Sequence, residues 1–147
     1  MIQRELALRH VESEAQALCC FPLMAQLRPH LASEIEFLER WRRQAADGYR
    51  LVALFDGLRP LALAGFRVQE NLVYGRFLYV DDLVTDAALR RAGHGERLMW
   101  HLREQARTLG CRMLVLDTPL SNALGHRFYF RCGLLATALR FNTTIEV

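Results

Sequence analysis

The chain has 147 residues, of which 52% are hydrophobic and 24% are charged, and its formal net charge at pH 7 is +3. A chain of this size is expected to form one domain, residues 1–147, with a substantial core. No apolar run approaches the roughly 20 residues that span a bilayer, and the charged N-terminus does not resemble a signal peptide, so we expect a cytoplasmic protein without a membrane partner.

The basic and sulfur-containing residues exclude two further classes of protein. All 19 basic residues are arginines, and they are spread along the chain rather than gathered in a stripe, so no nucleic-acid partner is expected. The four cysteines have neither C-x-x-C spacing nor closely spaced histidines beside them. We therefore expect reduced thiols and no metal site.

The first third of the chain is expected to hold one strand and two helical regions. Residues 2–8 predict a first strand. Residues 12–31 suit helix, but Pro22 and Pro29 should break that helix into pieces. The sequence Ser33-Glu34-Ile35-Glu36 is a capping box, which predicts a helix that Gly48 ends. The expected buried face of that helix is Ile35, Leu38, Trp41 and Ala45.

Three antiparallel strands are expected next. Two apolar runs, residues 49–55 and 60–68, are separated by the turn signal Asp56-Gly57, which is typical of a β-hairpin. A second break at residues 69–71 leads into a third strand, from about Arg76 to Thr85.

The remaining elements complete a mixed sheet. A helix is expected from about Gly95 to Leu109, with Leu98, Leu102, Gln105/Ala106 and Leu109 as its buried stripe. The apolar run Cys111 to Leu116 predicts a parallel strand buried on both faces. A helix from Ser121 or Asn122 to Arg131 and a final strand from Ala136 to Val147 follow. The predicted order is therefore β, α, α, β, β, β, α, β, α, β, an α/β fold with a mixed sheet.

The link between the third strand and the next helix carries a glycine motif. Residues 90–95, RRAGHG, fit the pattern R/Q-x-x-G-x-G/A. Gly93 and Gly95 have no Cβ and let a ligand approach the backbone. The first N–H groups of the helix have no partner within it, and its dipole is positive at this end. These features predict a cradle for an anion, most simply a pyrophosphate, although the same pattern also occurs in a plain tight turn.

Two motifs resemble those of the GNAT superfamily of N-acetyltransferases, which move an acetyl group from acetyl-CoA to an amine. One is LYVDDLVTDAALRRAGHGERL, which contains the glycine motif, and the other is NALGHRFYFRCGL, from Asn122 to Leu134. The second is similar to N-x-x-A-x-x-F-Y-x-x-x-G-F, with Gly125 and Leu134 replacing alanine and phenylalanine. The likeness covers about residue 50 to the C-terminus. It implies a GNAT-like fold, in which antiparallel N-terminal strands precede a βαβ acetyl-CoA-binding unit and helices cover both faces.

The resemblance implies acetyl-CoA as the acetyl donor. Its pyrophosphate would lie on the glycine motif, and its pantetheine arm would bind the backbone of the preceding strand as an added strand. That strand would part from the next one, commonly at a β-bulge, and one of its N–H groups would stabilise the oxyanion. The expected cofactor-binding residues are Leu83, Val84, Thr85, Arg90, Arg91, Ala92, Gly93, His94, Gly95, Glu96 and Asn122. Asn122 could instead be the N-cap of its helix, or serve both purposes.

Three residues are candidates for catalysis. Tyr129 can protonate the departing CoA thiolate as a general acid, or it can simply pack its helix against the sheet. Strand alternation should send Asp81 and Asp82 to opposite faces, where one of them holds the cationic amine or relays its proton. The alternative for both carboxylates is a surface ion pair with an arginine. Which group is the base stays open.

The acceptor is expected to be a small cationic primary amine, favoured by the two adjacent carboxylates. A lysine or N-terminal amine of a protein or peptide is the alternative acceptor, and a non-catalytic acyl-CoA-binding regulatory domain is the alternative function. An NAD-type dinucleotide protein is disfavoured, because antiparallel strands precede the glycine motif and no G-x-G-x-x-G is present. A homodimer stays open.

Overall fold

The computed structural model describes residues 5–146, and the chain divides into two compact units, residues 1–116 and 117–147. The first unit is built on a five-stranded sheet in the order β1-β2-β3-β4-β5. Its strands are β1 (Leu6–His10), β2 (Arg50–Asp56), β3 (Arg59–Asn71), β4 (Gly75–Thr85) and β5 (Met113–Leu116). Neighbouring strands are antiparallel except β4 and β5, which are parallel. The predicted mixed sheet is confirmed; the part of the first predicted strand at residues 2–4 lies outside the described residues.

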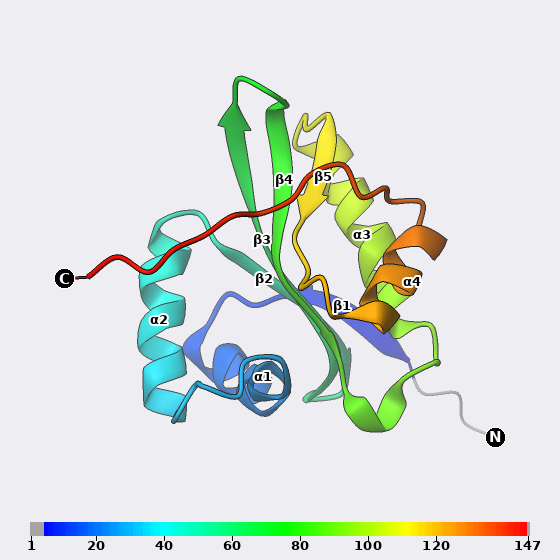
Figure 1. Ribbon diagram of the computed structural model, residues 1–147. Coiled ribbons are helices and arrows are strands. Elements are labelled where there is room, and N and C mark those ends of the chain that lie inside the picture. The colour runs from blue at the N-terminus through cyan, green and yellow to red at the C-terminus, as the bar shows by residue number, and fades with distance from the viewer. Residues whose placement is uncertain (1–4, 147) are drawn as a thin grey trace. The chain divides into compact units, whose positions relative to one another are not determined.

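Helices cover both faces of this sheet (Figure 1). Helices α1 (Glu14–Leu27) and α2 (Glu34–Ala46) pack on one face, and α3 (His94–Thr108) packs on the other. Strand β2 serves both cores, because alternate residues of a strand point to opposite faces. Leu51 and Ala53 belong to the core under α1 and α2, whereas Val52 between them belongs to the core under α3.

Pro22 does not break the first helix, contrary to the sequence prediction. Helix α1 continues through Pro22 and ends at Leu27, just before the Arg28-Pro29 pair, where a proline disfavours helix for the preceding residue. Its buried residues, Ala17, Cys20, Leu23 and Met24, lie on both sides of the proline. We infer that their burial outweighs the one backbone hydrogen bond that Pro22 removes.

The next two helices follow the predicted caps but not every predicted buried position. The Ser33 hydroxyl accepts a hydrogen bond from the Glu36 N–H, which confirms the N-terminus of α2. Ile35 is nevertheless 72% exposed, because the buried face centres on Phe37. In α3 the buried residues are Leu98, Met99, Leu102 and Ala106. Leu109 is exposed, because it is the C-cap of α3 rather than part of its buried stripe.

Two strand predictions near the C-terminus are wrong. Strand β5 is not buried on both faces: it is the last strand of the sheet, and Met113 is 43% exposed. Residues 136–146 contain no strand, although their composition favours one, and residue 147 lies outside the described part. A β-branched composition fits a pleated surface, but a strand also needs a partner strand. The second unit does contain α4 (Ala123–Arg131), as predicted.

The single domain expected over residues 1–147 stays a prediction. Within the described residues, no helix is both long enough and apolar enough to cross a bilayer.

Candidate active site

The predicted anion cradle lies at the start of α3. Gly93 precedes this helix with a φ of 81° and has no side chain to cap it. The other α-helices of the described chain begin differently, because the side chains of Ser13, Ser33 and Asn122 accept hydrogen bonds from the first turns of α1, α2 and α4. A Cβ placed on Gly93 would meet no atom within 4 Å, so the space beside it is open. An open, uncapped helix N-terminus suits a phosphate-like anion.

The backbone before Gly93 is strained. Arg91 has a φ of 70°, in the left-handed region, and it is the one non-glycine residue of the described chain with a positive φ. This conformation costs a non-glycine residue about 1 to 2 kcal/mol. Such strain clusters at ligand-binding sites, where the surrounding structure maintains it.

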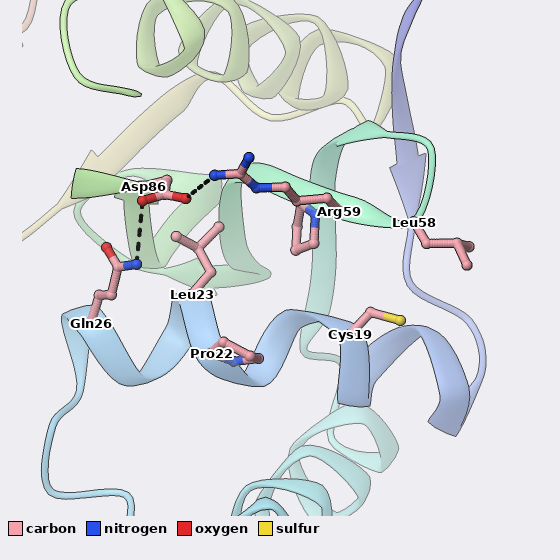
Figure 2. Close-up of a pocket in the computed structure, with 8 residues that line it drawn as sticks. Cys19, Pro22, Leu23, Gln26, Leu58, Arg59 and Asp86 are labelled. Carbon is pink, nitrogen blue, oxygen red and sulfur yellow. Dashed lines mark hydrogen bonds and ion pairs between the residues drawn. The ribbon is translucent and has the colours of Figure 1, made fainter. Parts of the chain in front are cut away.

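Asp86 anchors the segment that leads from β4 into the cradle (Figure 2). Its carboxylate accepts hydrogen bonds from the Ala88 N–H at 3.1 Å and from Arg59 Nη2 on β3 at 2.9 Å. Gln26 of α1 donates to Asp86 at 3.4 Å and accepts from the Ala87 N–H at 3.0 Å. The hydrogen bonds that the Asp86 carboxylate accepts, led by the one from Ala88, lower the pKa of Asp86 below its usual value. A cavity of about 260 Å³ lies beside this junction, between α1 and the start of β3.

One edge of β4 loses its partner strand just before the cradle. Residues 77–80 of β4 pair with β5, and this ladder stops at the pair Val80 and Leu116. Leu83, Val84 and Thr85 continue to pair with β3. Among the described residues no strand pairs with the other edge of these three, so it can accept an extended ligand as an added strand. The predicted parting of the two strands is therefore present.

A β-bulge lies where the strands part. Gly65 of β3 pairs with Asp82, but the next residue, Phe66, pairs with Val80, so Asp81 is an extra residue in β4. The bulge reverses the alternation of β4. Leu78, Val80 and then Leu83 belong to the core under α3, whereas Val84 belongs to the core under α1 and α2.

The prediction that Asp81 and Asp82 point to opposite faces is therefore wrong. The two carboxylates join one set of side chains, which we call the carboxylate cluster: Arg28, Tyr49, Arg67, Asp81 and Asp82. Tyr49 Oη donates to Asp82 Oδ2 at 2.7 Å, and Arg28 Nε donates to Asp82 Oδ1 at 3.0 Å. Arg67 Nε donates to Asp81 Oδ2 at 3.2 Å, and its guanidinium lies 5.5 Å from the centre of the Tyr49 ring. The bulge explains this arrangement, because one extra residue places adjacent side chains on the same side of the strand.

The cluster holds both carboxylates in partly buried ion pairs. Their side chains are only 23% (Asp81) and 15% (Asp82) exposed. Both carboxylates therefore pair with arginines, as the alternative expectation for them had it, but these ion pairs do not lie at the open surface. Burial raises the pKa of Asp81 above its usual 3.8, against the opposing effect of Arg67. Burial, followed by the charge of Asp82, raises the pKa of Tyr49 well above 10. Tyr49 is therefore a protonated donor at neutral pH, and Asp81 is a stronger base than an exposed aspartate.

Three members of the cluster were not foreseen from the sequence, namely Arg28, Tyr49 and Arg67. They come from the end of α1, the residue before β2, and β3. One signal for Tyr49 was available, because a glycine inside a strand often marks a close approach of other atoms. A Cβ on Gly65 would lie 1.9 Å from Tyr49 Oη, so only a glycine leaves room for the ring.

The second unit holds the other two predicted site residues. Asn122 is the N-cap of α4: its Oδ1 accepts from the Gly125 N–H at 3.1 Å, and its Nδ2 donates to Thr118 Oγ1 at 3.0 Å. Burial raises the pKa of Tyr129 above its usual value of 10. The phenol is therefore protonated at neutral pH, which a general acid requires.

Comparisons with known proteins agree with this set of features. Residues 11–134 match the Acetyltransferase (GNAT) family. The chain is 32% identical over 110 residues to the uncharacterized N-acetyltransferase YhdJ of Bacillus subtilis, covering 74% of this chain and 77% of that one. It is 36% identical over 121 residues to glucosamine 6-phosphate N-acetyltransferase 1 of Oryza sativa subsp. japonica, covering 77% and 71% of the two chains.

Solved structures show the same fold. The aminoglycoside N-acetyltransferase AAC(6')-Iy in complex with CoA superposes with a TM-score of 0.85 at 14% identity, covering 97% of this chain and 96% of that one. The family match and the relatives named N-acetyltransferases identify an acetyl-CoA-dependent N-acetyltransferase, and the mixed sheet, the uncapped helix and the parted strands fit that class. The chain belongs to the GNAT acetyltransferase family.

Proposed function

We propose that this protein acetylates a small primary amine, cationic when free in solution, by direct attack of the amine on acetyl-CoA. The observation that carries this proposal is the open, uncapped start of α3, which follows the unpaired edge of β4 after a short link, residues 86–92. Two similar proteins are named for acetyl transfer to small amines, glucosamine 6-phosphate and an aminoglycoside. Their names support a small acceptor over a protein one.

The cradle and the strand edge would hold the donor. Backbone N–H groups from Arg91 to Glu96 suit the pyrophosphate, and Arg90 adds positive charge nearby. The backbone of Leu83, Val84 and Thr85 suits the pantetheine arm, and an N–H of this edge would stabilise the developing oxyanion. Acetyl-CoA supplies an activated thioester, and the residues around it need only orient it and manage protons.

The carboxylate cluster would handle the acceptor. A primary amine has a pKa near 10.4 and must lose a proton before it can attack. Asp81, whose pKa is raised by burial, takes that proton directly or through water, while Tyr49 and Arg28 hold Asp82 in place. The nitrogen lone pair then attacks the thioester carbonyl to form a tetrahedral intermediate, which collapses as the C–S bond breaks and Tyr129 protonates the departing thiolate. The second proton that the nitrogen loses is carried by water and restores the Tyr129 phenol, and the proton on Asp81 is released to solvent.

Binding of the donor can be tested without knowing the acceptor. Gly93→Ala and Gly110→Ala form a matched pair, because both glycines have a positive φ and open space around them, at opposite ends of α3. We expect Gly93→Ala to weaken acetyl-CoA binding in calorimetry by at least about tenfold, or about 1.4 kcal/mol. Gly110→Ala should bind acetyl-CoA like the wild type. Equal affinity in all three proteins would contradict the cradle.

Catalysis can be tested by following free CoA thiol with a panel of amines that includes glucosamine 6-phosphate, an aminoglycoside and a polyamine. We expect release of CoA with at least one of them, and Tyr129→Phe to slow that release by about 10² to 10⁴ while acetyl-CoA binding is retained. Tight acetyl-CoA binding without turnover of any amine would instead indicate a binding domain.

A further inference from the structure

The carboxylate cluster is electrically balanced, because an arginine is paired with each of its aspartates. Arg28 lies 2.9 Å from Asp82, and Arg67 lies 3.2 Å from Asp81. Burial raises the pKa of Tyr49, so the fifth member of the cluster adds no charge at neutral pH. The cluster therefore has no net negative charge with which to attract a cation.

Both guanidiniums of the cluster are held in place with hydrogen-bond donors to spare. Arg28 donates from Nε to Asp82 Oδ1 at 3.0 Å and from Nη2 to the Asp81 carbonyl oxygen at 2.8 Å. Arg67 donates from Nε to Asp81 Oδ2 at 3.2 Å and from Nη2 to Gln44 Oε1 of α2 at 2.5 Å. Neither Nη1 has a hydrogen-bond partner within residues 5–146. The two side chains are 41% and 25% exposed, so a ligand can reach them.

An ordered guanidinium with open N–H groups suits an acid group. Its planar donors match the geometry of a carboxylate or a phosphate. Because the hydrogen bonds within the cluster already order both arginine side chains, binding an anion costs them little further conformational entropy. The cluster lies at the bulge, next to the unpaired edge of residues 83–85 that the proposed function assigns to the pantetheine arm. An anion bound here would therefore belong to the acceptor.

Proton transfer to Asp81 strengthens the preference for an acid group. When Asp81 takes a proton from the amine, the net charge of the cluster changes from zero to +1. An acceptor with one negative group changes from zero to −1 in the same step, so the two new charges attract each other in a partly buried place. An acceptor without an acid group changes from +1 to zero, and the new charge of the cluster then has no counterion.

We propose that the acceptor is a small amine that also carries an acid group, either a carboxylate or a phosphate, and that Arg28 and Arg67 bind this acid group while Asp81 faces the amine. This inference rests on the proposed function and deepens it by naming the class of substrate. Amines of this class are zwitterionic, and polyamines and other purely cationic amines are excluded from it.

Matched acceptors test the proposal in the wild type. Ethanolamine carries no acid group, serine adds a carboxylate to it, and phosphoethanolamine adds a phosphate; glucosamine and glucosamine 6-phosphate form a second set. Within a set, we expect kcat/KM for CoA release to be at least about tenfold higher for an acid-bearing member. Preference for serine would identify a carboxylate, and preference for a phosphorylated member would identify a phosphate. Equal or higher kcat/KM for the acid-free member of both sets would overturn the proposal.

Arg28→Gln and Arg67→Gln test the two binding residues through a ratio, the kcat/KM of the acid-bearing acceptor divided by that of the acid-free one. A general loss of folding or catalysis lowers both values and leaves the ratio unchanged. Loss of an anion-binding group raises KM for the acid-bearing acceptor, so the ratio should fall about tenfold. Arg40→Gln is the matched control, because Arg40 also pairs with a carboxylate, that of Glu36, and is 46% exposed. A ratio that stays unchanged in both cluster variants would overturn the proposal.

Acceptor binding to the wild type loaded with CoA separates this inference from the acetylation itself. CoA carries no acetyl group, so no reaction occurs and calorimetry reports acceptor binding alone. Selective binding of acid-bearing members without turnover of any amine by acetyl-CoA would contradict the acetylation and support the anion-binding role of the arginines. Turnover that favours acid-free members would support the acetylation and overturn this inference. Failure of every acid-bearing member to bind at millimolar concentration would overturn it as well.

Discussion

Gly65→Ala should destabilise the protein by displacing Tyr49. The new Cβ would lie 1.9 Å from Tyr49 Oη and 2.4 Å from its Cζ, far inside contact distance. The obstacle is a ring rather than a flexible tip, and Tyr49 is only 6% exposed, so the ring must leave a packed site. Displacement breaks its hydrogen bond to the Asp82 carboxylate, a kind of bond worth about 1.5 to 3 kcal/mol.

Overpacking of a well-filled site adds a typical cost of about 1 to 3 kcal/mol. The two costs overlap, because a ring that moves away loses its hydrogen bond but relieves the clash. We therefore expect Gly65→Ala to lower the free energy of unfolding by about 3 kcal/mol.

A double-mutant cycle with Tyr49→Ala assigns this cost to the ring. Urea unfolding is followed by far-UV circular dichroism at one protein concentration for the wild type, both single variants and the double variant. Once Tyr49 is removed, adding the Gly65→Ala change should cost no more than about 0.5 kcal/mol, as for sites that no longer interact. An equal cost of Gly65→Ala in both backgrounds would refute the reasoning, because the destabilisation would then come from the strand backbone rather than from the ring.

Three further predictions concern other groups. Burial lowers the pKa of His101, so the unfolded chain binds more protons than the folded protein, and the free energy of unfolding should fall as the pH drops through 6.5. His101→Gln should reduce this pH dependence, measured as the difference between urea midpoints at pH 7.5 and 5.5. An unchanged difference would exclude His101 as its source. Because the pKa of Asp81 is raised above 3.8, the rate of CoA release should rise with pH through the pKa of Asp81. Asp81→Asn should remove this rise from the acid side of the pH–rate profile. A rise that persists in Asp81→Asn would assign the base to another group. Asn122→Ala removes the N-cap of α4 and should destabilise that helix by about 1 kcal/mol. The measurement is amide hydrogen exchange, which should become faster in residues 123–131. Unchanged exchange would show that the cap is dispensable.

The order of the elements could be predicted because local signals fix most of them. Asp56-Gly57 separates two strands, Ser33 starts α2, and the glycines at 93 and 110 bound α3, so turns and caps alone locate these elements. The prediction of a helix break at Pro22 failed because the free-energy cost of a proline inside a helix is real but smaller than the stabilisation from burying the helix around it. The prediction of a final strand at residues 136–147 failed for a different reason. Composition shows which structure a segment is suited to, but a strand forms only where it has a partner strand.

The cradle could be located from the sequence, whereas the carboxylate cluster could not. Gly93 and the following helix are neighbours in the chain, and their chemistry is set by backbone geometry. Arg28 and Asp82 are 54 positions apart, and their contact depends on how α1 packs over the sheet. Strand alternation even pointed away from the cluster, because a bulge is a feature of the pairing between two strands and leaves no mark in one of them.

The extra residue in β4 also sets how evolution and engineering can alter the length of this strand. Asp81 itself could be deleted without changing the face of any later side chain, because Val80 already pairs with Phe66 and Asp82 with Gly65. A deletion after the bulge has the opposite effect: if Leu83 were lost and the bulge kept, Val84 would pair with Ala64 and move from the core under α1 and α2 to the core under α3. The turn between β3 and β4, where Leu72 and Val73 are exposed, lies at the other end of the strand and can change in length without altering this phase. Insertions and deletions should therefore accumulate at that turn, while the number of residues from the bulge to the cradle stays constant.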